Sequence, residues 1–111
     1  MAKADFVPGG KVTVRDLGGG CGRKVLAHND SMMAVEVHFE EGAVGAEHTH
    51  PHTQISYVLE GEFRYTVEGE AYLMKPGDSV CVESGAKHGT VCLKKGILLD
   101  VFTPARQDFL E

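Results

Sequence analysis

The sequence contains no tryptophan, only 4 prolines and no long run of apolar residues among its 111 positions. No segment approaches the roughly 18 apolar residues that a membrane-spanning helix needs. The first residues, "MAKADFVPGG", also lack the apolar core of a signal peptide. We therefore expect a cytoplasmic protein that makes no contact with a membrane.

Basic residues are also scarce, with 11 Lys and Arg against 16 Asp and Glu and a formal net charge of −5. Binding to nucleic acid requires a basic surface that neutralises phosphates, so this charge balance argues against a nucleic-acid partner. It leaves room for a small anionic ligand, because a local positive pocket can exist inside an acidic protein.

Cysteine is present only three times, as Cys21, Cys81 and Cys92, and never in a CxxC pair. The odd number and a reducing compartment predict that all three are free thiols. Cys81 and Cys92 lie in apolar stretches typical of buried strands, whereas Cys21 in "GGGCG" is expected in an exposed turn.

The residues that are abundant indicate an all-β protein. Glycine occurs 14 times, and short runs of β-branched and aromatic residues alternate with turn signals. No amphipathic helix is evident before residues 104–111, where we expect a short helical turn. The length suits one domain, residues 1–111. About nine strands at intervals of about 8 to 12 residues predict a sandwich or barrel, at residues 11–17, 23–28, 32–40, 53–61, 62–69, 70–75, 78–82, 88–94 and 97–103.

The stretch "EHTHPHTQ", residues 47–54, is a candidate metal site. His48 and His50 lie on one face of an extended chain, and Gln54 has the same parity. These three side chains cannot complete a shell of about four to six ligands, so His88 is the natural fourth candidate. Two histidines two residues apart would also suit an exposed strand edge, but the flanking glycines and the later histidine favour a metal site.

These residues resemble the two sequence motifs of the cupin superfamily. The first motif corresponds to Gly42-x5-His48-x-His50-x3-Gln54-x6-Gly61. The second corresponds to Gly77, "DSVCV", "ESG", "AK" and His88. The resemblance implies a small cupin barrel, which is a double-stranded β-helix or jelly roll. It also implies metal ligation by His48, His50, Gln54 and His88.

The sequence departs from the family pattern at three positions. Gln54 replaces the usual glutamate, Glu83 replaces a proline, and Cys92 stands where an asparagine is often found. A neutral amide leaves a divalent centre with a charge of about +2, which favours Lewis-acid chemistry over the oxygen chemistry of iron–carboxylate sites. Imidazole ligands suit Ni, Zn, Fe or Mn. We expect one divalent metal ion, with His52 at the pocket rim and His38 in a packing or surface role.

The last predicted strand carries an acid within the apolar run "LLDVFTPAR", residues 98–106. A buried carboxyl is costly unless it is paired or functional, so Asp100 is a candidate acid or base facing the cavity. Phe102 shares its face, and Arg106 is suited to bind a carboxylate. The alternative is structural: Asp100 pairs with Arg106 or caps a turn.

The tail Asp100-x-Phe102-x3-Arg106 resembles that of the pectin-degradation cupins of the KdgF type. This resemblance implies an enzyme that converts ring-form 4,5-unsaturated uronates from pectin or alginate into linear keto sugars. It implies that Asp100, Phe102 and Arg106 are the catalytic residues and that a small anionic sugar is the substrate. A cupin dioxygenase, another metal-dependent small-molecule enzyme and a non-catalytic metal- or sugar-binding module are the alternatives.

Small cupins commonly dimerise, so a homodimer is also expected. The apolar row Ile55, Tyr57 and Leu59 would suit either packing between sheets or an interface between subunits.

Overall fold

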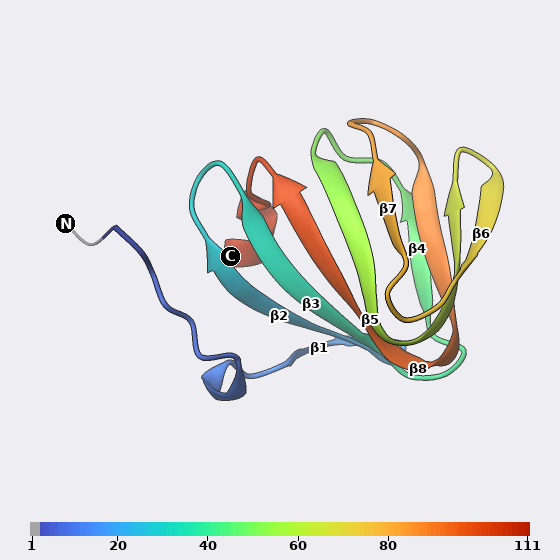
Figure 1. The fold of residues 1–111 in the computed structure, drawn as a ribbon, viewed down its shortest axis with the longest axis horizontal. Coiled ribbons are helices and arrows are strands. Elements are labelled where there is room, and N and C mark those ends of the chain that lie inside the picture. The colour runs from blue at the N-terminus through green and yellow to red at the C-terminus, as the bar shows by residue number, and fades with distance from the viewer. Residues whose placement is uncertain (1–2) are drawn as a thin grey trace.

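The computed structural model describes residues 3–111, which form eight strands and two short 3-10 turns (Figure 1). A single hydrogen-bonded network joins all eight strands, each pairing antiparallel to its neighbours. The elements are η1 (Gly9–Lys11), β1 (Arg15–Gly18), β2 (Cys21–His28), β3 (Met33–Phe39), β4 (Val44–His48), β5 (Thr53–Val67), β6 (Glu70–Met74), β7 (Ser79–Val82), β8 (His88–Thr103) and η2 (Gln107–Leu110). The expected all-β jelly roll with a short C-terminal turn is therefore confirmed.

The long strands β5 and β8 pair with each other along nearly their whole lengths and belong to both sheets of the jelly roll. The first half of β5 and the second half of β8 carry β7 and β3 on their outer edges, and β2 and β1 follow β3. The second half of β5 and the first half of β8 carry β6 and β4. The strands converge at the lower end in Figure 1 and spread apart at the upper end.

Each long strand changes sheets at a glycine. The β5–β8 register shifts between Val58 and Phe63. Gly61 lies there with φ +80°, and a Cβ atom on it would fall 2.6 Å from the Lys95 carbonyl oxygen. Only glycine permits both this backbone conformation and so close an approach of the two strands.

These bends explain the main error in the predicted strands. Residues 53–61 and 62–69 were expected as two strands but form the single strand β5. Residues 88–94 and 97–103 likewise join in β8. Gly96, in "KKG", was interpreted as a turn signal, and Gly61 was expected to end the strand 53–61. The chain instead bends at both glycines without reversing direction.

Two further boundaries differ from the prediction. Residues 11–17 were expected as one strand, but β1 begins only at Arg15 and the turn η1 precedes it. The strand β4 was not predicted, because "EEGAVG" was interpreted as a turn between strands. β4 matters for the site because it ends at His48.

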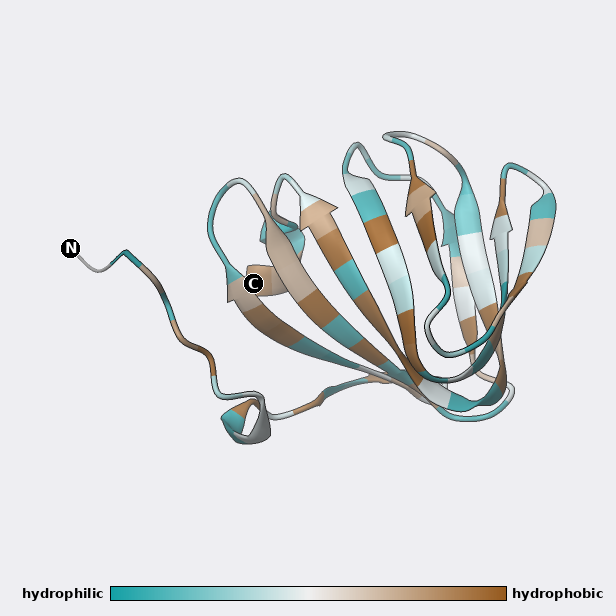
Figure 2. Ribbon diagram, viewed as in Figure 1, coloured by the Kyte–Doolittle hydropathy of each residue, from teal (hydrophilic) through white to brown (hydrophobic). Residues whose placement is uncertain are grey.

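The core lies between the two sheets and follows the alternation of apolar residues along the strands (Figure 2). In β5, Val58 is buried, while Ile55, Tyr57 and Leu59 on the opposite face are 40–46% exposed. Alternation therefore places Gln54 and Ser56, which have the parity of Val58, inside the barrel.

The three cysteines are free, as predicted. Cys92 is buried as expected, but Cys81 is exposed, so its prediction as a core residue was wrong. Cys21 is half-buried.

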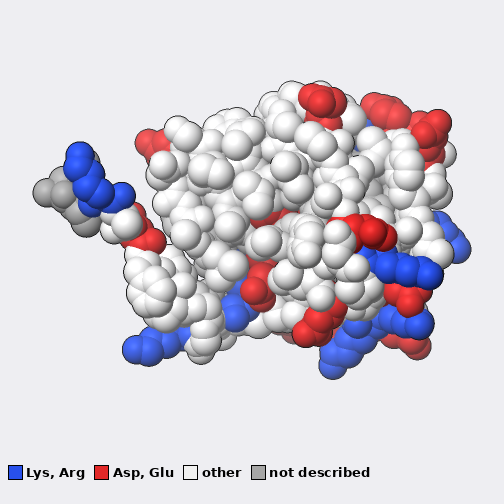
Figure 3. Space-filling model, in the orientation of Figure 1, with Lys and Arg blue, Asp and Glu red and all other residues white. Residues whose placement is uncertain are grey.

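Among residues 3–111, no helix is long and apolar enough to cross a membrane. On the face shown in Figure 3, acidic and basic side chains mix along the lower edge, and the centre carries little charge.

Candidate metal centre and adjoining cavity

Three histidines from different parts of the chain come together, of which His48 is exposed and His88 is buried. His48 ends β4, His50 lies in the following loop, and His88 begins β8. His48 and His88 are directly opposite each other in the β4–β8 register. One ring nitrogen from each of the three histidines lies within 4.8 Å of the others, so this group could hold a metal ion.

Backbone carbonyls orient two of these rings. Nδ1 of His48 lies 2.8 Å from the Ala46 carbonyl oxygen, and Nδ1 of His88 lies 2.8 Å from that of Ala86. A carbonyl oxygen only accepts hydrogen bonds, so Nδ1 carries the proton in both rings and Nε2 keeps its lone pair. Such outer hydrogen bonds are typical of histidines that bind metals.

The donor atoms fit a metal ion in a further respect. Nε2 of His88 and Nδ1 of His50 are both buried, and neither has a hydrogen-bond partner. Burial lowers the pKa of both His50 and His88, which favours the neutral imidazole that metal ligation requires.

Gln54 turns its amide oxygen toward His50. Oε1 lies 2.9 Å from Nε2 of His50, and the amide nitrogen donates to the Ser56 hydroxyl at 3.0 Å and the Tyr65 hydroxyl at 3.1 Å. Because an amide oxygen only accepts hydrogen bonds, Nε2 of His50 carries the proton and donates to Gln54, and the unpartnered Nδ1 of His50 keeps its lone pair.

The same polar chain continues to Asp100. The Ser56 hydroxyl donates to Oδ1 of Asp100 at 2.6 Å, and Ser56 and Asp100 are opposite each other in the β5–β8 register. Burial raises the pKa of Asp100 to about 6, against the opposing effects of the Ser56 hydrogen bond and the charge of Arg106. A carboxyl with this pKa can exchange a proton near neutral pH.

The structural alternative for Asp100 does not hold. Arg106 forms its ion pair with Asp108, not with Asp100, and the hydrogen-bond partner of Asp100 is Ser56. Asp100 lies within a strand and caps no turn. Its carboxyl therefore remains available to a ligand in the cavity.

Phe102 and Arg106 lie close to the histidines, and Phe102 is opposite Gln54 in the β5–β8 register. The ring of Phe102 is 5.8 Å from the ring of His50, centre to centre. The guanidinium carbon of Arg106 lies 5.2 Å from the centre of the Phe102 ring.

A cavity of about 150 Å³ joins most of these groups. It is smaller than the roughly 300 Å³ at the low end of drug-sized ligand sites, so it suits a small molecule. Its lining includes His48, Gln54, Tyr65, His88, Asp100, Phe102 and Arg106. A larger hollow of about 550 Å³ lies near the turn at residues 18–22 and the bend of β5 and β8, and none of these residues lines it.

Two other histidines take minor positions. The His52 ring lies 5.3 Å from that of His50, yet His52 is not one of the three clustered histidines. His38 pairs with Glu36 at 2.9 Å on the half-buried outer face of β3, in agreement with the expected surface or packing role.

Ser56 and Tyr65 were missed by the sequence analysis. Ser56 shares the inward parity of Gln54, which was a usable signal. Its partnership with Asp100 depends on the pairing of strands 44 residues apart, which alternation alone does not reveal.

Comparison with known proteins agrees with this geometry. The family model described as "Cupin domain" matches residues 35–102. The chain is 43% identical to the pectin degradation protein KdgF of Dickeya dadantii over 97 residues, which cover 86% of this chain and 88% of that protein.

Two solved structures are also similar over nearly the whole chain. The structure of KdgF from a Halomonas species matches with a TM-score of 0.93 and 37% identity, covering 96% of this chain and 99% of that one. An RmlC-like cupin from Shewanella frigidimarina matches with a TM-score of 0.92 and 44% identity, covering 96% of each chain.

Proposed function

Because the chain belongs to the cupin domain family, we propose that it is a metal-dependent enzyme that opens the ring of 4,5-unsaturated uronates from pectin or alginate breakdown. One observation carries the proposal. Two of the three clustered histidines, His48 and His88, border one small cavity together with the buried acid Asp100 and the cation of Arg106. The similarity to a pectin degradation protein supports this class of substrate.

In this proposal, His48, His50, Gln54 and His88 would hold one divalent ion of Ni, Zn, Fe or Mn. The bound ion would supply a Lewis acid that withdraws charge from sugar oxygens. Its four protein ligands are neutral, so they leave its positive charge undiminished. The chain contributes three imidazole nitrogens, from His48, His50 and His88, that lie within 4.8 Å of one another.

Arg106 and Phe102 bind and orient the sugar. The guanidinium binds the carboxylate at C6, because a charged hydrogen bond is strong in a site shielded from water. Phe102 offers an apolar surface to one face of the sugar ring and separates it from the core residues behind.

Asp100 moves the proton. Its carboxylate takes the proton of the anomeric hydroxyl, C1 and that oxygen become an aldehyde, and the bond between C1 and the ring oxygen breaks. The released electron pair stays on the ring oxygen at C5 as an enolate. A proton returned to C4 gives the ketone at C5, so the reaction is an isomerisation that needs no oxidant.

The test uses unsaturated mono-uronates from pectin and alginate lyase digests. Loss of the ultraviolet absorbance of the conjugated enol ether reports turnover. We expect acceleration by the metal-loaded protein, no turnover by Asp100→Asn with its metal content intact, and normal turnover by the exposed control Asp5→Asn. Turnover by Asp100→Asn at the normal rate would remove the role of Asp100.

The competing function is that of a cupin dioxygenase. It predicts iron in the purified protein and consumption of oxygen, which elemental analysis and an oxygen electrode measure on the same sample. A non-catalytic sugar-binding module would bind the uronate without changing the spontaneous rate of its absorbance loss.

The proposal also includes a homodimer acting in the cytoplasm. Three free cysteines suit a reducing compartment. The exposed row Ile55, Tyr57 and Leu59 supports an interface between subunits. Light scattering on the wild type and Tyr57→Glu tests the dimer, which the charged variant should dissociate.

A further inference from the structure

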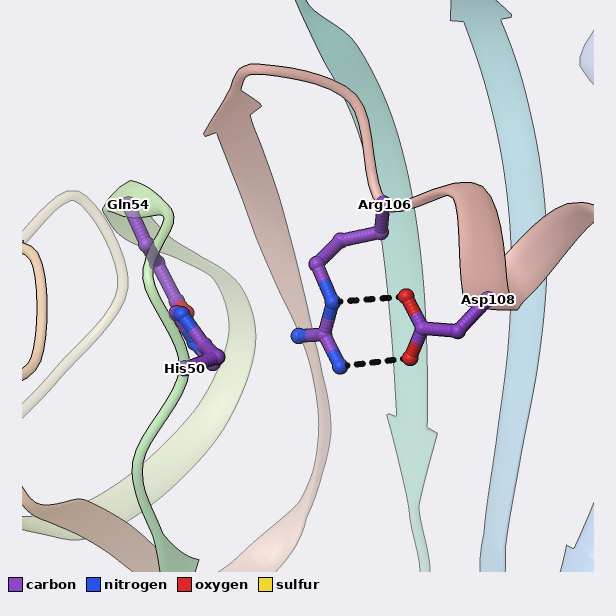
Figure 4. Close-up of polar contacts among 4 residues, drawn as sticks. All are labelled: His50, Gln54, Arg106 and Asp108. Carbon is purple, nitrogen blue, oxygen red and sulfur yellow. Dashed lines mark hydrogen bonds and ion pairs between the residues drawn. The ribbon is translucent and has the colours of Figure 1, made fainter.

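The guanidinium of Arg106 is held along one edge by the C-terminal turn η2. Nε donates to Oδ1 of Asp108 at 3.0 Å, and Nη2 donates to Oδ2 at 2.9 Å (Figure 4). The side chain of Arg106 is only 12% exposed, whereas that of Asp108 is 57% exposed. This two-bond contact fixes the plane of the guanidinium as well as its position.

Aromatic rings confine the same guanidinium further. Its central carbon lies 4.2 Å from the centre of the Phe109 ring and 5.2 Å from that of Phe102. Arg23 stacks on Phe109 as well, at 3.9 Å. Since Phe109 also packs edge-to-face on Phe102, the turn that carries Asp108 is anchored to the body of the barrel.

This arrangement leaves one nitrogen of Arg106 for a ligand. Among residues 3–111, its side-chain hydrogen bonds are the two to Asp108, and Nη1 makes neither of them. In Figure 4, Nη1 points away from Asp108, toward the side where His50 and Gln54 lie. Arg106 also lines the cavity.

We propose that Asp108 is a positioning residue that holds Arg106 with Nη1 directed into the cavity, where it binds the carboxylate of the substrate. This inference rests on the proposed function. In the opposite role, Asp108 would compete with the substrate carboxylate for Arg106. That role would require the guanidinium edge that pairs with Asp108 to face the histidines. The paired edge is instead turned away from them.

The kinetic test uses Asp108→Ala and Asp108→Asn in the metal-loaded protein. Without Asp108 the guanidinium loses its fixed orientation, so we expect KM for the unsaturated uronate to rise about tenfold, the loss expected from one misaligned charged hydrogen bond. The value of kcat should change less than about twofold, because the carboxylate is bound equally before and during the reaction. Gln107→Ala, in the same turn, is the matched control and should behave as the wild type.

A neutral substrate separates positioning from general damage to the fold. The methyl ester of the same sugar has no carboxylate charge for Arg106 to bind. Its kcat/KM should be the same in Asp108→Ala and in the wild type. An equal loss with both substrates would overturn the proposal, as would a lower KM in Asp108→Ala, which would identify Asp108 as a competitor.

A binding measurement distinguishes failure of this inference from failure of the proposed function. D-galacturonate carries the same carboxylate but no enol ether, and calorimetry measures its affinity without turnover. We expect Asp108→Ala to weaken its binding about tenfold. An active wild type whose galacturonate affinity is insensitive to Asp108 would overturn the inference alone. An inactive wild type with the expected loss of affinity would overturn only the proposed function, and an inactive wild type that binds no galacturonate would overturn both.

Discussion

At the scale of single residues, the site depends on the direction of a chain of hydrogen bonds. The amide nitrogen of Gln54 donates to Ser56 and Tyr65, and the hydroxyl of Ser56 donates to Asp100. The Ser56 hydrogen is committed to Asp100, so Tyr65, 2.9 Å away, donates to the Ser56 oxygen. The amide of Gln54 thus accepts a hydrogen bond from His50 through its oxygen, and through its nitrogen it orients Ser56, which holds Asp100.

The buried Asp100 predicts a pH-dependent stability in the metal-free protein. Its pKa is raised from 3.8 to about 6, so the native state holds the proton more tightly than the unfolded state does. The stability contributed by protonation is complete below about pH 4 and is lost as the pH rises to about 6. The shift of about 2 units corresponds to on the order of 3 kcal/mol.

Asp100→Asn removes this titration while keeping an oxygen that accepts from Ser56. In urea unfolding of the metal-free proteins, the free energy of unfolding of the wild type should fall relative to that of the variant between about pH 4 and 6. Above that range the difference between the two proteins should stay constant. A difference that does not change with pH would contradict the raised pKa.

Gln54→Glu tests the role of the neutral amide. The new carboxylate would lower the net charge of the metal centre and would add a negative charge beside Asp100. It would also remove the two N–H donors to Ser56 and Tyr65. We expect metal binding to persist and kcat to fall about 100-fold, as at other altered metal shells.

The measurement is turnover together with metal content, with the exposed Gln107→Glu as the control for the same substitution elsewhere. Unchanged turnover in Gln54→Glu would show that the amide is not needed for the reaction.

At the scale of elements, the bends in β5 and β8 bring the two sheets together around the site. Gly61 and Gly69 both have positive φ, +80° and +82°. A Cβ on Gly61 would overlap the β8 backbone, whereas a Cβ on Gly69 meets nothing within 4 Å. Substitution of Gly61 therefore introduces both steric overlap and backbone strain, whereas substitution of Gly69 introduces backbone strain alone.

Gly61→Ala should lower the free energy of unfolding by at least about 3 kcal/mol, the sum of backbone strain and overpacking. Gly69→Ala should cost only the backbone strain, about 1 to 2 kcal/mol. Denaturant unfolding of both variants measures the difference, and equal losses would contradict the close approach of β5 and β8 at Gly61.

The sequence predicted the elements unevenly, for physical reasons. Alternation identified most strands, because one face of each is buried. It could not distinguish a bend from a reversal, since glycine serves both, and β5 and β8 were each divided in two. The strand β4 is short, and its side chains are largely exposed, so no alternation marked it.

The candidate site was predicted in the same uneven way. The histidines, Gln54 and Asp100 carry chemistry that is visible in residue type and spacing. The roles of Ser56 and Asp108 arise from contacts that only the folded chain creates.

At the scale of the whole molecule, a bound metal ion should link the two sheets. His48 and His88 come from the sheet with β4, whereas Gln54 lies in the sheet with β7. A ligand present at about 100 times its Kd stabilises the native state by about 2.7 kcal/mol. In a domain of this size, each 1 kcal/mol moves Tm by about 4 °C.

For a metal ion present at about 100 times its Kd, removal by a chelator should thus lower Tm by about 10 °C. The variant His48→Ala should show much less of this shift, and the outward-facing control His28→Ala should show all of it. An identical Tm before and after removal of a bound ion would contradict a metal centre joined to the fold.

The most direct test of the central claim is turnover of a 4,5-unsaturated uronate by one sample in three states: metal-loaded, stripped by a chelator, and reloaded. The account predicts rapid loss of the enol-ether absorbance, then only the spontaneous rate, then recovery. A spontaneous rate in all three states, with the metal content verified, would contradict it.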